Sequence, residues 1–225
     1  MVRAIRVDSR TKPRPMTATS RPAYLDGKDK KLLKCLRAGD ENCYEILVRS
    51  FGPRVLATAR QYLRSDADAA DCFQDTFLAV FESVDKFEQR STIATWIRGI
   101  TINQCLMRIR AQGRRQEDSI EHLLPVFDER GDRVRSYTSN RSCGIGDTID
   151  AAQMKRIVRE NILSLPDTFR VTLLLRDIDG YSTKETATIL GISVTAAKTR
   201  LHRARTALGA LLQPEMERLK YHADV

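Results

Sequence analysis

The sequence predicts an all-α protein made of two small helical domains, and three observations support this fold class. Apolar residues recur at steps of three and four from Lys28 to about Gln112, and again from Ile149 to Leu212. Neither stretch contains an alternating run of β-branched residues long enough to predict a sheet. The segment between them holds four glycines, a proline and mixed charges, which is typical of a flexible linker. We therefore predict a disordered basic tail over 1–27, helical domains over 28–112 and 149–213, a linker over 113–148 and a second tail over 214–225.

The charge of the chain favours a polyanionic partner. Its 225 residues include 38 Lys and Arg against 29 Asp and Glu, which gives a formal net charge of +9 and a pI of about 9.5. Nucleic acid is the first candidate, although an anionic membrane surface would fit on charge alone. Because the sequence has no run of 18 or more apolar residues and no hydrophobic signal core at its start, we predict a soluble protein that is neither inserted in a membrane nor exported. The basic tail either attracts phosphates loosely or is a solvated leader.

The cysteines and histidines do not form a recognisable site. The number of cysteines is odd, and they include no CxxC pair and no neighbouring His cluster. We predict free thiols instead of a disulfide framework or a zinc site, for Cys35, Cys43, Cys72, Cys105 and Cys143. The sequence also shows no phosphate-binding glycine loop and no nucleophile–base arrangement. We therefore predict no catalytic residue, no metal and no cofactor.

The clearest local motif is a helix-turn-helix near the C-terminus. Ser182 and Glu185 have the spacing of a capping box, in which each side chain satisfies a free backbone N–H of the first helical turn. Gly191 follows an apolar pair, at the position where a left-handed residue ends a helix. Ser193 can cap the next helix almost at once. Two helices joined by so short a turn are typical of a DNA-binding helix-turn-helix.

The second helix of this motif is amphipathic and cationic. We predict one buried stripe formed by Val194, Ala197, Leu201, Ala204, Leu208 and Leu211, and an end to the helix near Pro214. A basic helix of this kind matches the width of the DNA major groove. The alternative is a solvated charged helix in an ordinary bundle. The residues placed to meet base edges or phosphates are Thr195, Ala196, Lys198, Thr199, Arg200, His202, Arg203 and Arg205, and the sequence does not divide those two roles among them.

An acidic stripe lies in the N-terminal helical region. At about 100° per residue, the apolar residues from Phe73 to Val84 share one face. The opposite face gathers Asp68, Asp71, Asp75 and Glu82. An acidic face in a basic protein does not serve DNA; it is either solvated or a docking face for a basic partner, and charge alone favours the solvated surface.

A polar loop and a basic helix follow the acidic stripe. Ser91 or Thr92 is placed to cap a helix whose predicted apolar face is Ile93, Trp96, Ile97, Ile100 and Met107. Basic residues flank this face, and a basic helix beside loop aromatics is how proteins hold single strands. Trp96 on the apolar stripe is more often a core residue than a stacking platform. Phe87 in the loop fits either role.

From Asn42 to Leu212, apart from the linker, the chain resembles the extracytoplasmic-function RNA polymerase sigma factors. The family's acidic D-x-x-Q-[DE]-x-F helix is matched here, as are its D-[RK]-F loop, its T-W-[LI] helix start, its L-P and L-L-L-R-D segments, its G-[YL]-S turn and its K-[ST]-R-L-H-R-A-R helix. The matching residues are Asp71 to Phe77, Asp85 to Phe87, Thr95 to Ile97, Leu165 to Pro166, Leu173 to Asp177, Gly180 to Ser182 and Lys198 to Arg205.

The resemblance implies a bacterial, cytoplasmic transcription initiation factor without enzymatic chemistry, serving a stress or envelope-response regulon. It implies four partners: the β′ clamp coiled coil and the β flap of core RNA polymerase, promoter DNA, and an anti-sigma factor. The polymerase contacts it implies are Asp71, Gln74 and Asp75. The minus-ten DNA contacts it implies are Phe87, Glu88, Gln89, Arg90, Ser91, Asn103, Arg108 and Arg110. The minus-thirty-five contacts it implies are Ser193, Thr195, Ala196, Lys198, Thr199, Arg200, His202 and Arg203.

The sequence differs from the family motifs at two places, and two alternative functions remain open. Gln89 stands where the family often has Gly, and Thr195-Ala196-Ala197 replaces the commoner Gly-Thr-Val, so promoter preference does not transfer. One alternative is a helix-turn-helix regulator that binds operators without polymerase and uses its N-terminal helices for dimerisation or sensing. The other is a basic scaffold that sequesters a protein. The scaffold alone predicts no salt-dependent DNA affinity in the C-terminal domain.

Overall fold

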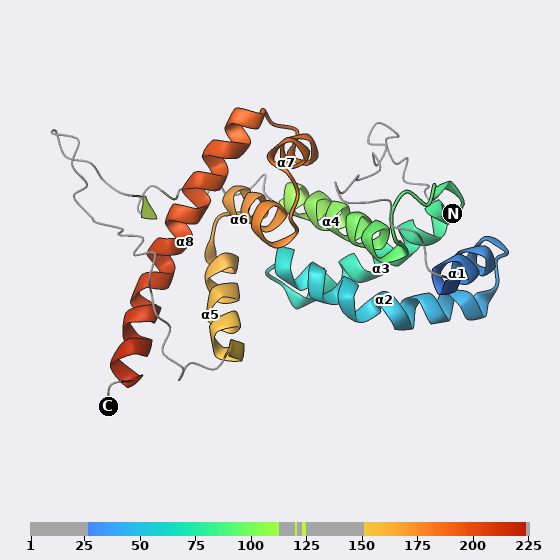
Figure 1. The fold of residues 1–225 in the computed structure, drawn as a ribbon, viewed down its shortest axis with the longest axis horizontal. Coiled ribbons are helices and arrows are strands. Elements are labelled where there is room, and N and C mark those ends of the chain that lie inside the picture. The colour runs from blue at the N-terminus through green and yellow to red at the C-terminus, as the bar shows by residue number, and fades with distance from the viewer. Residues whose placement is uncertain (1–26, 113–119, 121–122, 125–150, 224–225) are drawn as a thin grey trace, which may run out of the picture. The chain divides into compact units, whose positions relative to one another are not determined.

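The protein was analysed as a computed structural model, which describes residues 27–112, 120, 123–124 and 151–223. All regular structure in these residues is helical (Figure 1). The chain divides into two compact units, Met1–Arg60 with Ser65–Arg108 and Gln61–Arg64 with Ile109–Val225. The predicted all-α fold with two helical domains is confirmed. The predicted N-terminal tail and nearly all of the linker lie outside the described residues, and no helix in the described residues is long and apolar enough to span a bilayer.

The first unit contains α1 (Gly27–Arg37), α3 (Asp66–Ser83) and the short turn η1 (Val84–Lys86). It also contains α2 (Glu41–Tyr62) up to Arg60 and α4 (Ile93–Gln112) up to Arg108. Side chains cap two of these helices. Ser65 accepts a hydrogen bond from the backbone N–H of Asp68, and Thr92 accepts one from that of Thr95 at 3.1 Å. Thr92 is therefore the cap of α4, one of the two residues predicted for that role.

The core of the first unit joins α1 to the other helices. Buried residues of α1 and α2 pack with the predicted apolar face of α3 and with the start of α4; among them are Leu33, Leu36, Leu47, Phe77, Val80, Val84, Phe87, Ile93 and Ile97. Met107 was predicted on the buried face of α4 but is 58% exposed. In the second half of α4 the buried residues are Ile102, Cys105, Leu106 and Ile109. Since each residue turns the helix by about 100°, the buried stripe has moved round the helix and leaves Met107 outside.

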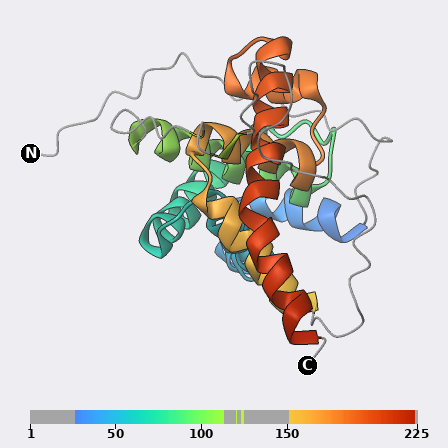
Figure 2. The same ribbon diagram turned by 90° about the vertical axis from the view of Figure 1, so that its left-hand side faces the viewer.

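The second unit contains α5 (Ala151–Ser164), α6 (Asp167–Leu173), the π-helical turn η4 (Leu174–Ile178), α7 (Thr183–Leu190) and α8 (Val194–Ala223). Figures 1 and 2 both show α5 running beside the C-terminal half of α8. Leu165, Val171 and Leu175 are buried here together with Ala197 and Ala204 of α8.

Three details of the second unit correct the sequence predictions. The helix predicted to end near Pro214 continues through it to Ala223. A proline removes one intrahelical hydrogen bond, and a long helix packed against α5 tolerates that loss. The sequence favours Pro166 as the first residue of a helix, but Pro166 stands at the N-cap of α6, and Asp167 is the first helical residue. Val194, predicted on the buried stripe, is 42% exposed because it opens the helix before the packed part begins.

The prediction of free thiols is wrong for one pair of cysteines. Cys35 and Cys43 form a disulfide between the end of α1 and the start of α2, with their Cα atoms 6.1 Å apart. The pair is brought together by a tight turn in which Gly39 adopts φ 75°, a conformation that favours glycine. Cys72 and Cys105 are buried free thiols, as predicted, and Cys143 lies outside the described residues.

Candidate protein-binding and nucleic-acid-binding surfaces

The acidic face of α3 is organised around one arginine from α4. The guanidinium of Arg108 lies 2.8 Å from a carboxylate oxygen of Asp75, 3.1 Å from one of Asp71 and 3.6 Å from one of Asp68. We call Asp68, Asp71, Asp75 and Arg108 the acidic cluster. Three carboxylates against one guanidinium leave this cluster with a net charge of −2. The face therefore remains negative while its carboxylates are held in place.

Electrostatics fix Arg108 in the charged form. Partial burial lowers the pKa of Arg108, but the hydrogen bond and charge of Asp75, with those of Asp71, outweigh it and raise the pKa overall. Beneath the cluster, the thiols of Cys72 and Cys105 lie 3.4 Å apart. The hydrogen bond to Cys72 and burial raise the pKa of the Cys105 thiol, so it stays protonated. The α3–α4 junction is thus a fixed base for the acidic face.

An exposed leucine lies within the acidic stripe. Leu78 is 59% exposed, and at about 100° per residue it falls between Asp71 and Gln74 around the helix and close to Glu82. Gln74 and Glu82 are exposed as well. Protein-binding faces combine an apolar centre with a polar surround, and α3 offers this combination. Leu78 was not among the predicted contacts, although its spacing of seven residues from Asp71 places it on the same side of the helix.

The start of the loop between α3 and α4 is held by an aromatic contact to α4 and by hydrogen bonds from α1. Phe87 is only 6% exposed and stacks on Trp96 with ring centroids 4.6 Å apart. Trp96 itself packs against the core, the role that its position in the sequence favoured. The Arg37 guanidinium at the end of α1 donates hydrogen bonds to the carbonyl oxygens of Val84, Asp85 and Phe87, at 3.4, 3.5 and 2.7 Å.

The outer part of this loop is presented to solvent. Glu88, Gln89 and Arg90 are exposed, and Ser91 is half-buried. Gln89 has φ 58°, a left-handed conformation that costs a glycine little and a longer side chain more. The substitution of Gln for the family's frequent Gly therefore falls where the backbone favours Gly.

The α4 residues predicted to meet DNA do not share one face. Trp96, Asn103 and Arg110 are spaced by seven, so they follow one side of the helix within about 40°. Since Phe87 stacks on Trp96, the loop lies on that same side. Arg108 points about 150° away from Asn103 and Arg110, toward α3. Asn103 and Arg110 thus follow the side of α4 on which Trp96 lies, and Arg108 faces away from that side.

The helix-turn-helix has the predicted caps. The Ser182 N–H donates to the Glu185 carboxylate at 2.8 Å, and the Glu185 N–H donates to the Ser182 hydroxyl at 3.2 Å. Gly191 ends α7 in the left-handed region, with φ 68°. Ser193 accepts a hydrogen bond from the Ala196 N–H at 3.1 Å and so caps α8. These bonds fix the turn between the two helices.

The predicted DNA-contacting residues lie along the open side of α8. Ser193, Thr195, Lys198, Thr199, His202 and Arg203 are exposed, and Ala196 and Arg200 are half-buried. Ala197, Leu201 and Ala204 are buried on the opposite side. Arg205 differs because its Nε and Nη2 atoms donate hydrogen bonds to the carboxylate of Asp177 in η4, at 2.9 and 2.7 Å. The hydrogen bond to Asp177 raises the pKa of Arg205. Arg205 is thus held within the unit.

Two family models match the two units. The Sigma-70 region 2 model matches residues 47–115, and the Sigma-70, region 4 model matches residues 155–208. The chain is 27% identical over 191 residues to the ECF RNA polymerase sigma-E factors of Salmonella typhimurium and Escherichia coli K12, which covers 84% of this chain and 97% of each relative. It is also 27% identical over 188 residues to the RNA polymerase sigma-H factor of Pseudomonas aeruginosa, covering 83% and 95%.

Solved structures with similar chains include CnrH in complex with the cytosolic domain of CnrY, at 24% identity, 83% and 97% coverage and a TM-score of 0.47. A second is the sigma factor RpoE with the anti-sigma factor NepR from Bartonella quintana, at 22% identity, 76% and 96% coverage and a TM-score of 0.47. The assignment rests on the two family models, matched in order, and on relatives similar over nearly their whole length. This chain belongs to the extracytoplasmic-function family of RNA polymerase sigma factors, which direct promoter recognition and transcription initiation.

Proposed function

We propose that this sigma factor binds core RNA polymerase through the acidic face of α3, with Asp71, Gln74, Asp75 and the newly identified Leu78 as its contacts. The observation that carries this proposal is the acidic cluster, which keeps a net negative charge around an exposed leucine. A basic surface of the β′ clamp coiled coil would complement it. Arg108, considered from the sequence as a minus-ten DNA contact, acts here as the residue that orders the carboxylates.

The minus-ten element meets the loop and the adjacent side of α4. Its contacts are Glu88, Gln89, Arg90 and Ser91 from the loop, with Asn103 and Arg110 from the helix. Phe87 was also considered as a contact. Because its ring is buried against Trp96, its role is to hold the loop in shape while exposed groups take up the unpaired strand. Capturing a flipped base offsets the few kcal/mol, roughly, that opening a base step costs, so no nucleotide hydrolysis is required.

The minus-thirty-five element is read by α8. The exposed side of this helix carries Thr195, Lys198, Thr199, His202 and Arg203, with Ser193 at its cap and Ala196 and Arg200 partly covered. Base edges and phosphates are both reached from such a helix in the major groove. The β flap of the polymerase holds the second unit, while the clamp holds the first. Two weak DNA contacts joined through one polymerase reach a specificity that neither has alone.

The remaining features follow from this function. The protein acts in the bacterial cytoplasm, catalyses no reaction and needs no cofactor, since its work is binding. An anti-sigma factor controls its access to polymerase. Its targets form a stress or envelope-response regulon.

Run-off transcription on a genomic promoter library with purified core polymerase tests the whole proposal. The protein should give transcripts only together with core enzyme, and their start sites should share two boxes at a fixed spacing. A helix-turn-helix regulator that works alone would bind its targets equally well without polymerase, and that result would refute the proposal.

Gln74→Arg tests the polymerase contact on its own. Gln74 is exposed and is not a member of the acidic cluster, so the fold should persist while the added charge opposes a basic partner. We expect core binding to weaken at least roughly tenfold, whereas Asp75→Arg should abolish it and also disturb Arg108. Glu45→Arg on α2, another exposed site of the first unit, is the matched control. Titration of labelled protein with core enzyme measures the affinity; equal losses for Gln74→Arg and Glu45→Arg would contradict the assignment.

A further inference from the structure

We propose that Cys35 and Cys43 are a reversible thiol–disulfide site whose oxidation state sets how firmly α1 holds the loop between α3 and α4. The inference rests on the function proposed above for that loop. It starts from a disulfide in a protein assigned to the cytoplasm, where such bonds are mostly transient and redox-sensing.

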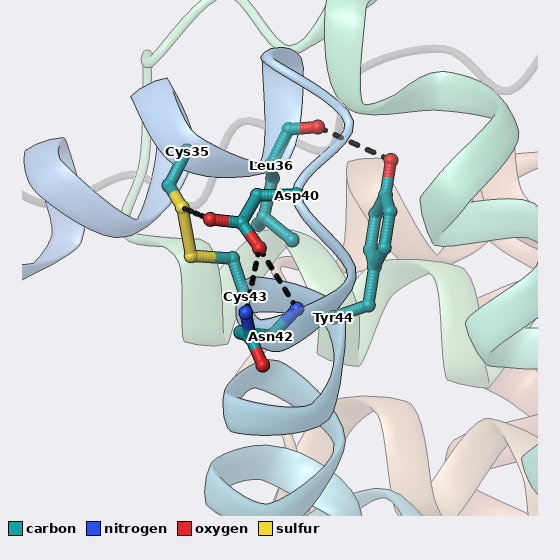
Figure 3. Close-up of a disulfide and its surroundings, with 6 residues drawn as sticks. All are labelled: Cys35, Leu36, Asp40, Asn42, Cys43 and Tyr44. Atoms are coloured by element: carbon teal, nitrogen blue, oxygen red, sulfur yellow. Dashed lines mark hydrogen bonds between the residues drawn. A yellow bond between two sulfur atoms is a disulfide. The ribbon is translucent and has the colours of Figure 1, made fainter.

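The disulfide sits in a compact turn with defined hydrogen bonds (Figure 3). One carboxylate oxygen of Asp40 accepts from the backbone N–H of Asn42 at 3.0 Å, and the other lies 3.5 Å from the sulfur of Cys35. The Cys43 N–H donates to the Asp40 carbonyl at 3.0 Å. The Tyr44 hydroxyl donates to the Leu36 carbonyl at 3.1 Å. These bonds order the start of α2, and the sulfur–sulfur bond ties the last turn of α1 to it.

The two sulfurs are chemically unequal. Cys43 lies in the first turn of α2, where the positive end of the helix dipole stabilises a thiolate. Cys35 lies in the last turn of α1 and beside the Asp40 carboxylate, and both features disfavour a thiolate there. Cys35 is also the more accessible, because it is half-buried while Cys43 is only 8% exposed. An incoming thiolate should therefore attack the sulfur of Cys35 and expel Cys43.

The exchange balances with a low-molecular-weight thiol as reductant. A first thiolate forms a bond to the Cys35 sulfur, and the Cys35–Cys43 bond breaks to release the Cys43 thiolate, which takes up a proton. A second thiolate attacks the reductant's sulfur in the mixed disulfide and releases Cys35 as a thiolate, which also takes up a proton. Two electrons and two protons pass to the protein, and the reductant leaves as its own disulfide. Oxidation by that small disulfide is the reverse sequence.

Arg37 links the oxidation state of the two cysteines to the loop between α3 and α4. Arg37 is two residues beyond Cys35, and its guanidinium donates to the carbonyls of Val84, Asp85 and Phe87. Leu33 and Leu36 of α1 share a core with Val84 and Phe87. Opening the disulfide releases the last turn of α1 to fray, which loosens the hold of Arg37 on the loop. The oxidised protein is therefore the form with the better-ordered minus-ten loop.

The other described cysteines do not compete for this chemistry. Cys72 and Cys105 are fully buried, and burial with the bond to Cys72 raises the pKa of the Cys105 thiol. The hydrogen bond to Cys105 lowers the pKa of the Cys72 thiol, but neither sulfur is open to a reagent in solution, so burial keeps this pair reduced. Cys143 lies outside the described residues, and Cys143→Ser removes it from the experiment.

The test uses the full chain carrying Cys143→Ser, equilibrated in glutathione buffers of stepped reduced-to-oxidised ratio. Alkylation of free thiols and mass spectrometry of peptides should show Cys35 and Cys43 passing together from disulfide to dithiol, with Cys72 and Cys105 reduced throughout. A pair that never interconverts across the series overturns the proposal.

The link to the loop is measured by hydrogen exchange and transcription. Amides of residues 84–91 should exchange about tenfold faster in the dithiol form, and core-dependent run-off transcription should fall in step. The double variant Cys35→Ser/Cys43→Ser should match the dithiol form and ignore the buffer. Equal loop exchange in both forms overturns the coupling. Loss of core-dependent transcription in every form, with the exchange difference intact, instead refutes the proposed function alone.

The same experiment distinguishes a redox site from a metal-binding site. The sulfurs of Cys35 and Cys43 and a carboxylate oxygen of Asp40 lie within 4.8 Å of one another. Zinc is therefore titrated onto the dithiol form. Failure of zinc to protect Cys35 and Cys43 from reoxidation supports a redox site, whereas a tight one-to-one zinc complex that blocks reoxidation overturns it in favour of a metal site.

Discussion

The acidic face of α3 and the cationic face of α8 are both charged surfaces assigned to binding, but they are built differently. The α3 carboxylates are ordered by Arg108, whose side chain is 25% exposed and reaches Asp71 and Asp75. The α8 residues Lys198 and Arg203 are exposed, and neither forms an ion pair with another residue in the described part of the chain. Replacing Asp71 or Asp75, which pair with Arg108, therefore alters fold and binding together, whereas replacing Lys198 or Arg203 alters binding alone.

Removing the ordering arginine should give the largest effect on stability. In Arg108→Ala, Asp68, Asp71 and Asp75 would repel one another without a counter-charge. We expect the free energy of unfolding to fall by about 2 kcal/mol, between the values for exposed and fully buried pairs. Urea unfolding followed by circular dichroism measures it.

Arg110→Ala is the matched control for that experiment, because Arg110 comes from the same end of α4 and is exposed. It should change the free energy of unfolding by less than about 0.5 kcal/mol. If Arg108→Ala were as mild, the acidic cluster would be only a surface arrangement, and the contrast between α3 and α8 would disappear.

Two arginines of α8, Arg203 and Arg205, test the comparison between the α3 and α8 surfaces at α8. Arg203→Ala should weaken DNA binding about fivefold and lower the slope of log affinity against log salt by about 1, with stability unchanged. Arg205→Ala should leave the slope nearly unchanged and cost about 0.5 kcal/mol of stability, since Arg205 bonds to Asp177. Fluorescence anisotropy with promoter DNA at several salt concentrations measures both variants. Equal slopes for the two would show that Arg205 leaves Asp177 to meet DNA.

The contrast also separates what the sequence could and could not predict. The caps at Ser182, Gly191 and Ser193 were predictable because each depends on residues within one or two helical turns. The orientation of Arg108 was not, since it depends on how α4 packs on α3. At the sequence level Arg108 is one basic residue among several on its helix, and it was grouped with Asn103 and Arg110 on the basis of family resemblance.

The errors have the same origin. The spacing of Cys35 and Cys43 does not show that Gly39 turns the chain back between them. Met107 fits the apolar stripe predicted for α4, but the buried face moves round the helix when its neighbours change. Pro214 ends many helices and does not end α8, where tertiary packing decides.

The pH dependence of stability probes the base of the acidic face. In the folded chain, the hydrogen bond to Cys72 and burial raise the pKa of Cys105 above its ordinary value of 9.0. The native thiol therefore keeps its proton where the unfolded one loses it, so the unfolded state binds fewer protons above about pH 9. The contribution of Cys105 to stability is complete below pH 9 and falls by about 1 kcal/mol per pH unit above it. Urea unfolding from pH 8 to pH 10 should show this fall, and Cys105→Ala should remove it. An identical alkaline slope in Cys105→Ala would mean that the α3–α4 junction opens to solvent, and that α3 is no more rigidly built than α8.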